Sequence, residues 1–340
     1  DGSRIEQSDG TAWMGLLSLN LLQTTVILAE EDREEYLELC GRFSRDFSSL
    51  TYALNSSSGR GYVNWDERDG FYYDVLKRPD GSTDYLRTRS ISGLIPLLAI
   101  TSFDASSVKT IPSLDIRKSL RKLGEERGST FDAISHLGSW HRNRVLFSIV
   151  PPTRLKRILK RVFDEDEFLS PYGIRSLSKI HESHPYSYQQ GDDFASISYS
   201  PADSPVAMFG GNSNWRGPVW IPINFLLIEA LQKFGHYFGE DFKIEFPTGS
   251  GQEMTLWEIS LELEKRIVGI FRRDERQRRA FNGEVDLFQK NPLWRDLFLF
   301  NEYFHGCNGS GVGASHQTGW TAIVAKMITQ LQRWQTNNQN

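Results

Sequence analysis

The pattern of apolar and polar residues predicts a mainly helical chain. Residues 11–30 are apolar on most faces, which is typical of a buried helix, and Asp9 stands at the N-terminal end of this stretch. In residues 31–54, the apolar side chains between Tyr36 and Phe47 recur at steps of three and four residues, as on an amphipathic helix. The chain therefore begins with two predicted helices, and a carboxylate lies at the entry to the first.

The rest of the chain alternates predicted helices with loops rich in aromatic residues. Residues 62–76 are aromatic, contain a glycine and have strand-like propensity. Residues 181–217 show no helical period and are predicted to form a long functional loop. Further helices are predicted at 86–104, 115–126, 153–164, 218–239, 255–273 and 317–334. No linker divides the chain, so we expect residues 1–340 to form a single all-α domain.

Composition and charge exclude several classes of protein. The 340 residues include 39 Lys and Arg against 43 Asp and Glu, without a basic block, so no nucleic-acid partner is expected. Two cysteines, Cys40 and Cys307, are too few for a disulfide framework. No membrane segment is expected, and the polar first residues lack the pattern of a signal peptide, which favours a cytoplasmic location. The oligomeric state stays open.

Aromatic residues are unusually frequent, at 12% of the chain, and they gather in three loop clusters with polar groups. These are residues 5–14, with two carboxylates near Trp13, residues 210–220, and residues 301–320, which include Glu302. Aromatic faces stack on the C–H faces of sugar rings, while amides, carboxylates and arginines bind their hydroxyls. Cleavage of a glycosidic bond needs two carboxyl groups, one to protonate the leaving oxygen and one to activate water or attack. A carbohydrate site is the chemistry that this composition favours.

Each candidate residue also has a purely structural interpretation. Asp9 could be a helix N-cap, and Glu302 could be a solvated carboxylate. Glu6 competes with Asp9 for the role of catalytic acid. Asp69 and Asp74 flank a glycine, where aspartate is common in turns. The tryptophans could belong to the core.

Cofactor and metal sites find little support in the sequence. His305 and His316 could bind a metal ion, but no third ligand stands at a recognised spacing. The glycines of residues 309–313 match neither a P-loop nor a dinucleotide-binding fingerprint. We therefore expect no metal and no cofactor.

Four strings resemble motifs of glycoside hydrolase family 63. They are EQSDGTAWM at 6–14, DERDGFYYDVL at 66–76, GGNSNWRGPVW at 210–220 and EYFHG…GVGASHQTGW at 302–320. The resemblance implies an (α/α)6 barrel whose N-terminal helices would lie outside this chain. It also implies hydrolysis of α-glucosides or oligosaccharides with inversion at the anomeric carbon.

The resemblance also implies roles for individual residues. Asp9 stands at the position of the general acid and Glu302 at that of the general base. Cys307 departs from the family pattern, where an acidic residue is expected. The residues expected to contact substrate are Trp13, Asp69, Phe71, Tyr73, Asp203, Trp215, Arg216, Trp220, His316 and Trp320.

Two other functions remain open at this point. A carbohydrate-binding or structural helical domain without catalytic activity would carry the same aromatic loops. A lyase or phosphorylase on an α/α barrel would share the architecture. The expected partner in the favoured interpretation is an oligosaccharide or a small α-glucoside.

Overall fold

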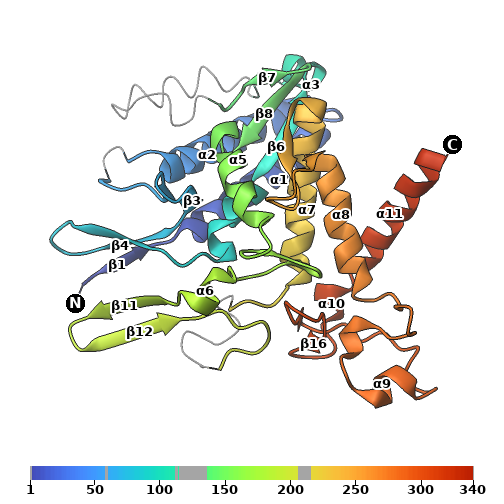
Figure 1. Ribbon diagram of the computed structural model, residues 1–340. Helices are drawn as coiled ribbons and strands as arrows, with labels where there is room; N and C mark the ends of the chain where they lie inside the picture. The colour runs from blue at the N-terminus through green and yellow to red at the C-terminus, as the bar shows by residue number, and fades with distance from the viewer. Residues whose placement is uncertain (1, 58–59, 112–113, 115–135, 206–215, 340) are drawn as a thin grey trace. The chain divides into compact units, whose positions relative to one another are not determined.

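The structure is a computed structural model that describes residues 2–57, 60–111, 114, 136–205 and 216–339 (Figure 1). It contains two compact units. The N-terminal unit is Asp1–Leu159 with Gln232–Phe242, and the C-terminal unit is Lys160–Leu231 with Lys243–Asn340. The division falls within two helices, α5 (Pro152–Val162) and α7 (Ile221–Phe238).

Helices account for 45% of the described residues and strands for 19%. The expectation of a mainly helical protein is thus confirmed. The strands form sheets of only two or three members, but their share is more than a purely all-α chain would have.

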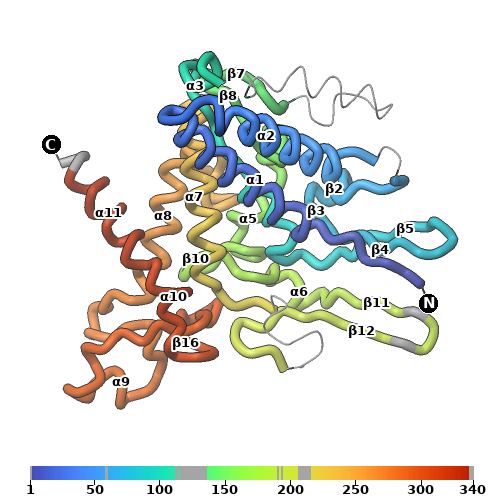
Figure 2. Tube along the Cα trace, turned by 180° about the vertical axis from the view of Figure 1, so that it is seen from behind, coloured from blue at the N-terminus to red at the C-terminus, as the bar shows by residue number. Residues whose placement is uncertain are grey.

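The first two helices pair in the N-terminal unit. α1 (Ser8–Leu28) and α2 (Arg33–Asn55) are joined by a short turn, and Figure 2 shows them side by side. Ala12, Leu19 and Leu22 of α1 are fully buried. α2 follows the predicted amphipathic pattern. α1 was expected to be buried on most faces, but it leaves apolar side chains such as Leu17 and Ile27 exposed.

A three-stranded antiparallel sheet fixes the entry to α1. β1 (Arg4–Glu6) pairs with β4 (Asp74–Lys77), which pairs in turn with β5 (Thr83–Leu86). Because the end of β1 lies opposite the start of β4, the chain enters α1 beside Asp74.

The N-terminal unit contains two further small sheets, with strand orders β2–β3 and β6–β8–β7. Their strands are β2 (Trp65–Asp66), β3 (Phe71–Tyr72), β6 (Ile100–Asp104), β7 (Trp140–His141) and β8 (Arg144–Ser148). The remaining short helices of this unit are η1 (Ile91–Gly93), η2 (Ile95–Leu98), α3 (Ala105–Thr110) and η6 (Gly239–Asp241). The strand-like propensity of residues 62–76 is confirmed by β2, β3 and the start of β4.

In the C-terminal unit, α8 (Leu256–Gly269) packs against α11 (Val324–Gln339). A capping box starts α8: Thr255 Oγ1 accepts a hydrogen bond from the backbone of Glu258, whose carboxylate accepts one from the backbone of Thr255. The unit also contains four two-stranded hairpins. They are β9 (Leu169–Ser170) with β10 (Gly173–Ile174), β11 (Tyr186–Gln190) with β12 (Asp193–Ile197), β13 (Lys243–Glu245) with β14 (Glu253–Thr255), and β15 (Tyr303–Phe304) with β16 (Gly311–Val312). The short helices are α6 (Ile180–Ser183), η7 (Ala280–Asn282), α9 (Asp286–Lys290) and α10 (Thr318–Thr321).

The helix predicted at 86–104 is wrong. These residues form the end of β5, the 3-10 helices η1 and η2, and β6. Pro96 lies in the first turn of η2, and the apolar run that follows becomes a strand because it pairs with β8 across more than forty residues of chain. The helix predicted at 115–126 lies outside the described residues.

The interpretation of residues 181–217 as one long loop is also wrong in part. Most of α6 and the whole β11–β12 hairpin lie within this segment. Alternating Tyr186 and Tyr188, followed by a Gly-Asp turn, carried a hairpin signal that the polar composition hid.

One described helix, α1, is long and apolar enough to span a membrane by its length and composition, so the expectation of no membrane segment stays a prediction. Its most apolar window has a mean hydropathy of 1.3. Core helices of soluble proteins meet the same criterion, and α1 buries Leu19 and Leu22 completely within its unit.

Candidate active site

Asp9 lies in the first turn of α1, in the N-terminal unit. The N-cap residue of α1 is Gln7, so the alternative of Asp9 as an N-cap is wrong. Its Oδ1 accepts a hydrogen bond from the backbone N–H of Gly10 at 2.7 Å, and the side chain is half-buried. Trp13, also half-buried, follows one turn later on the same helix face. Asp9 therefore accepts a backbone N–H of the first turn of its own helix without being the N-cap residue.

A second carboxylate sits close to Asp9. Asp74 accepts hydrogen bonds from the backbone N–H of Ser8 at 2.8 Å and from its hydroxyl at 3.0 Å. Burial raises the pKa of Asp9, and the negative charge of Asp74 raises it further, against a lowering by the Gly10 N–H. Asp9 therefore holds its proton more tightly than an ordinary aspartate.

Glu6, the competing carboxylate, is part of β1. Its side chain forms a hydrogen bond with Tyr62, and its backbone carbonyl accepts one from Asn64. This engagement in the sheet distinguishes Glu6 from Asp9.

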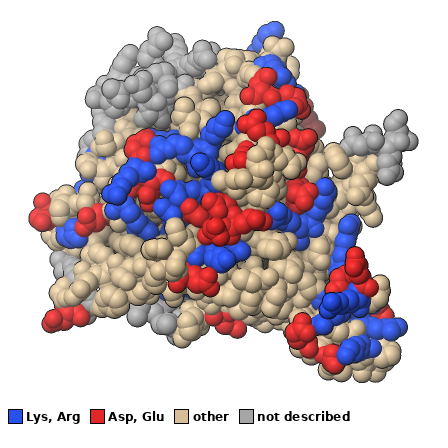
Figure 3. All heavy atoms as spheres, viewed as in Figure 1, with Lys and Arg blue, Asp and Glu red and all other residues tan. Residues whose placement is uncertain are grey.

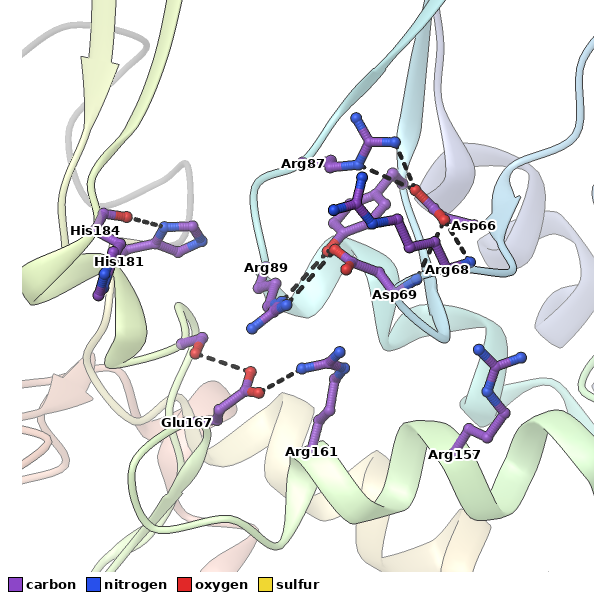
Figure 4. A network of polar contacts seen from close by, with 12 residues as sticks. Asp66, Arg68, Asp69, Arg87, Arg89, Arg157, Arg161, Glu167, His181 and His184 are labelled. Carbon is purple, nitrogen blue, oxygen red and sulfur yellow. Dashed lines mark hydrogen bonds and ion pairs between the residues drawn. The ribbon is translucent and has the colours of Figure 1, made fainter.

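The aromatic loop of the N-terminal unit forms a charged network, drawn in Figure 4. Asp69 accepts a 2.7 Å hydrogen bond from the Tyr73 hydroxyl and pairs with Arg89 at 3.6 Å. Phe71 is 0% exposed and Tyr73 1%, so their rings lie in the core. Burial and the hydrogen bond to Asp69 raise the pKa of Tyr73, which stays neutral. In this loop the carboxylate of Asp69 is half-buried, whereas that of Glu67 is exposed.

Glu302 lies directly before β15 in the C-terminal unit. Its backbone N–H donates to the carbonyl of Ala314 at 2.8 Å, and the Ala314 N–H donates to its Oε2 at 3.2 Å. Gly313 has a φ of +70°, and a Cβ there would lie 2.8 Å from that same oxygen. The hairpin thus fixes the half-buried carboxylate of Glu302 by backbone contacts that tolerate only glycine.

Aromatic rings gather beside Glu302 in the same unit. Tyr303 stacks on Trp220 with ring centroids 4.7 Å apart, and Trp220 meets Trp320 edge-on at 6.1 Å. Trp320 is 41% exposed, whereas Trp220 is buried. The Tyr303 hydroxyl donates to Asp203 at 2.7 Å. The structure therefore brings Glu302, Asp203, Trp220 and Trp320 into one cluster, although they are far apart in the chain.

The remaining predicted contacts fall into different environments. Arg216 is buried, which lowers the pKa of its guanidinium, and its backbone carbonyl accepts a hydrogen bond from Ser200. His316 is exposed and its backbone bridges to Phe300, next to the Glu302 hairpin. Trp215 lies outside the described residues.

The two candidate metal ligands differ in environment. His305 Nδ1 accepts hydrogen bonds from the backbone N–H groups of Cys307 and Asn308, and burial lowers the pKa of the ring. That nitrogen therefore orders its own loop. No cluster of metal-binding side chains occurs among the residues that the structure describes.

Sequence reasoning missed the contacts that three residues make. Asp74, already named from the sequence, is the charge partner of Asp9, Arg89 is the ionic partner of Asp69, and Ala314 donates to Glu302. Asp74 and Ala314 both sit in the motif strings, whereas Arg89 lies outside them. The strings give no sign of which atoms these residues contact.

Carboxyl groups and exposed tryptophans of this kind are typical of carbohydrate-active proteins. The family model of the glycosyl hydrolase family 63 C-terminal domain matches residues 4–245. The chain belongs to this family, which confirms the resemblance seen in the motifs.

Individual relatives agree with this assignment. The chain is 39% identical over 347 residues to an uncharacterized protein of Saccharomyces cerevisiae, covering 97% of this chain and 31% of the relative. It is 27% identical over 177 residues to a probable mannosyl-oligosaccharide glucosidase of Schizosaccharomyces pombe. It is 23% identical over 176 residues to the mannosyl-oligosaccharide glucosidase of Saccharomyces cerevisiae. Each of the latter matches covers 52% of this chain and 15% of the relative, so the chain spans less than a third of these proteins.

Proposed function

We propose that this protein is an inverting glycoside hydrolase that acts on α-glucosides or oligosaccharides. Asp9 is the general acid and Glu302 the general base. The proton of Asp9 passes to the glycosidic oxygen as the bond to the anomeric carbon breaks. A water attacks the opposite face of the sugar and gives its proton to Glu302, which leaves Asp9 ionised and Glu302 protonated.

The raised pKa of Asp9 is the observation that carries this proposal. A general acid must be protonated at the working pH, and an ordinary aspartate is not. Burial and the charge of Asp74 favour the protonated form, while the hydrogen bonds from Ser8 occupy Asp74. Two neighbouring carboxyl groups are thus in different environments, which supports an acid role for Asp9.

The cluster around Glu302 supports the role of a base that orients water beside a sugar. The exposed face of Trp320 offers a stacking surface, and Asp203 and Arg216 are our candidates for binding sugar hydroxyls. Trp13, Trp215, Trp220, His316 and Asp69 are proposed to complete the substrate contacts. Phe71 and Tyr73 are buried, so we assign them the task of positioning Asp69.

The (α/α)6 barrel belongs to the same proposal. Membership of the family supports it, and the paired helices α1 and α2 and the packed helices α8 and α11 are compatible with helical layers. As a substrate, we propose a glucose-containing oligosaccharide, because two relatives are described as mannosyl-oligosaccharide glucosidases.

The test is to follow the anomeric form of the product by NMR during hydrolysis of an α-glucoside by the purified protein. Initial release of the β-anomer is expected, and initial release of the α-anomer would contradict inversion. Asp9→Asn and Glu302→Gln should each abolish most of the turnover while leaving sugar binding intact. Binding without turnover in the unmodified protein would instead establish a carbohydrate-binding domain.

A further inference from the structure

The C-terminal unit contains a polar cavity whose lining includes no residue of the aromatic cluster. Its volume is about 630 Å³, in the range of small-molecule sites. It lies where the chain leaves α8 at Gly269 and turns toward η7. The lining includes five arginines: Arg272, Arg273, Arg276, Arg278 and Arg279.

A tight hairpin brings these arginines together. Arg273 and Arg279 face each other in an antiparallel bridge. Asp274 closes the turn between them, because its carboxylate accepts a 2.7 Å hydrogen bond from the backbone of Arg278. Gln277 takes a left-handed conformation, with a φ of +61°, at the tip. The backbone of this hairpin therefore holds the positively charged arginines close together.

The carboxylates of the cavity do not balance this charge. The lining contains two acids, Asp274 and Glu284, against the five arginines, and with Asp296, which pairs with Arg273, the local excess is two positive charges. Glu284 pairs with Arg278 at 2.7 Å, and Asp296 pairs with Arg273 at 2.5 Å. Figure 3 shows Lys and Arg gathered with Asp and Glu on the part of the molecule at the lower right, where Figure 1 labels α9.

Three guanidinium groups remain without a carboxylate partner in the described parts of the chain. Arg272 and Arg276 are exposed and make no ion pair there. Arg279 donates to the backbone carbonyls of Phe271 and Arg295, which carry no net charge. Burial lowers the pKa of Arg279, and the like charge of Arg273 lowers it further, against a raising by the charge of Asp296. Such crowding is unfavourable unless an anion offsets it.

Neutral hydrogen-bonding groups complete the cavity wall. Tyr172, Asn308 and Ser310 line it, and a Cβ at Gly309 would lie 2.6 Å from the Tyr172 ring. Asn308 and Ser310 belong to the tip of the β15–β16 hairpin, whose base carries Glu302. The cavity therefore shares a wall with the element that positions the candidate base.

We propose that this cavity binds a small ligand with a phosphate monoester or a free phosphate. The planar guanidinium fork matches phosphate oxygens in bidentate geometry. Phosphate at neutral pH carries a charge of about −1.5 to −2, which matches this excess of positive charge better than a single carboxylate does. The site is separate from the residues assigned to catalysis, so its test does not depend on glycosidase activity.

The experiment is isothermal titration calorimetry on the purified protein with inorganic phosphate and, separately, glucose 6-phosphate, at ionic strength held constant with chloride. The test variant is Arg272→Gln with Arg276→Gln, and the matched control is Arg333→Gln, an exposed arginine of α11 outside the cavity. Because the two test arginines make no ion pair in the described chain, the unfolding temperature should not change. We expect binding of at least one probe that weakens roughly tenfold or more in the double variant and is unchanged in the control.

The two probes identify the source of the phosphate. Tighter binding of glucose 6-phosphate indicates a phosphorylated sugar, and equal binding indicates phosphate itself. Absence of binding by both probes overturns the proposal. Equal affinity in the unmodified protein and the folded double variant overturns it as well, because the arginines would then not form the site.

Discussion

The surroundings of Asp9 and of Glu302 differ in the kind of contact that holds each carboxyl group. Asp9 has local backbone donors in Gly10 and its own N–H, a half-buried setting and a neighbouring negative charge from Asp74. Glu302 lies in a hairpin, receives the N–H of Ala314 and is followed by a stacked tyrosine. The first environment favours retention of a proton, and the second fixes a carboxylate in position. In the proposed mechanism, these environments suit a general acid and a general base, respectively.

The largest effect should distinguish these two tasks. Asp9→Asn should lower kcat on a natural disaccharide by about 10²–10⁴-fold, but much less on an aryl α-glucoside whose leaving group needs no proton. Glu302→Gln should lower kcat strongly on both substrates, because both need an activated water. Steady-state kinetics on the two substrates provides the measurement. Glu6→Gln is the matched control and should retain activity, since Glu6 is engaged by Tyr62.

An identical loss on both substrates for Asp9→Asn would contradict the assignment of Asp9 as the acid. Retained activity in Glu302→Gln would contradict the assignment of the base. Either result would remove the contrast between the two carboxyl groups.

The next effect concerns the acid stability of the N-terminal unit. His136 is buried and its Nε2 lies 2.7 Å from the carbonyl of Ser148, and burial lowers its pKa from 6.5 to about 4. Below pH 6.5 the unfolded chain binds a proton at His136, whereas the folded chain does not bind it until the pH is near 4. The free energy of unfolding therefore falls as the pH drops from 6.5 through 4. The full loss is about 3 kcal/mol.

Denaturant unfolding between pH 7 and 4 tests this expectation. The free energy of unfolding should fall less steeply with decreasing pH in His136→Gln, because the glutamine keeps a donor for Ser148 but does not titrate. His236→Gln, at an exposed position of the same unit, serves as control and should match the unmodified protein. A pH dependence unchanged in His136→Gln would assign the acid sensitivity to other groups.

A smaller effect is expected in the aromatic cluster. Tyr303→Phe removes the hydrogen bond to Asp203 but keeps the stacking on Trp220, so it should cost about 1 kcal/mol of unfolding free energy. Asp203→Asn keeps an acceptor for the tyrosine and should cost less. Chemical denaturation of both variants measures the difference. Equal stability of Tyr303→Phe and the unmodified protein would show that this hydrogen bond is replaced by water.

The subtlest effect is a shift in the pH profile. Activity that depends on protonated Asp9 falls as the pH rises through its pKa. Asp74→Asn removes the neighbouring charge, so the pKa of Asp9 should decrease and the alkaline limb should move to lower pH. An amide oxygen can still accept from Ser8, which preserves the fold.

Asp84→Asn in β5 is the matched control, since Asp84 pairs with Arg78 and does not influence Asp9. Its alkaline limb should coincide with that of the unmodified protein. If the alkaline limb of the pH profile does not move in Asp74→Asn, the group that titrates there is not Asp9.

Local patterns predicted the helices well because their signals lie within a few turns. The periodic apolar residues of α2 and the apolar stretch of α1 both became helices close to their expected bounds. The helix predicted at 86–104 is wrong for the opposite reason. The strand β6 forms there because β8, far along the chain, pairs with it. Apolar runs without period do not reveal which partner will bury them.

The site shows the same division between local and distant information. The motif strings identified Asp9, Glu302 and their neighbours as candidates. They could not reveal that Tyr303 reaches Asp203, one hundred residues earlier, or that Ala314 holds Glu302. Nor could they show that the rings of Phe71 and Tyr73 are core, because burial depends on packing that no short motif encodes.

The Trp220–Tyr303–Trp320 cluster gives the protein an intrinsic optical reporter. Trp320 is partly exposed to water while Trp220 is buried against Tyr303, so a sugar that covers Trp320 should shift its emission to shorter wavelength. The difference between spectra of the unmodified protein and Trp320→Phe isolates this signal from the other tryptophans. Ligand occupancy near Glu302 can therefore be followed in real time without a label, even for sugars that are never cleaved.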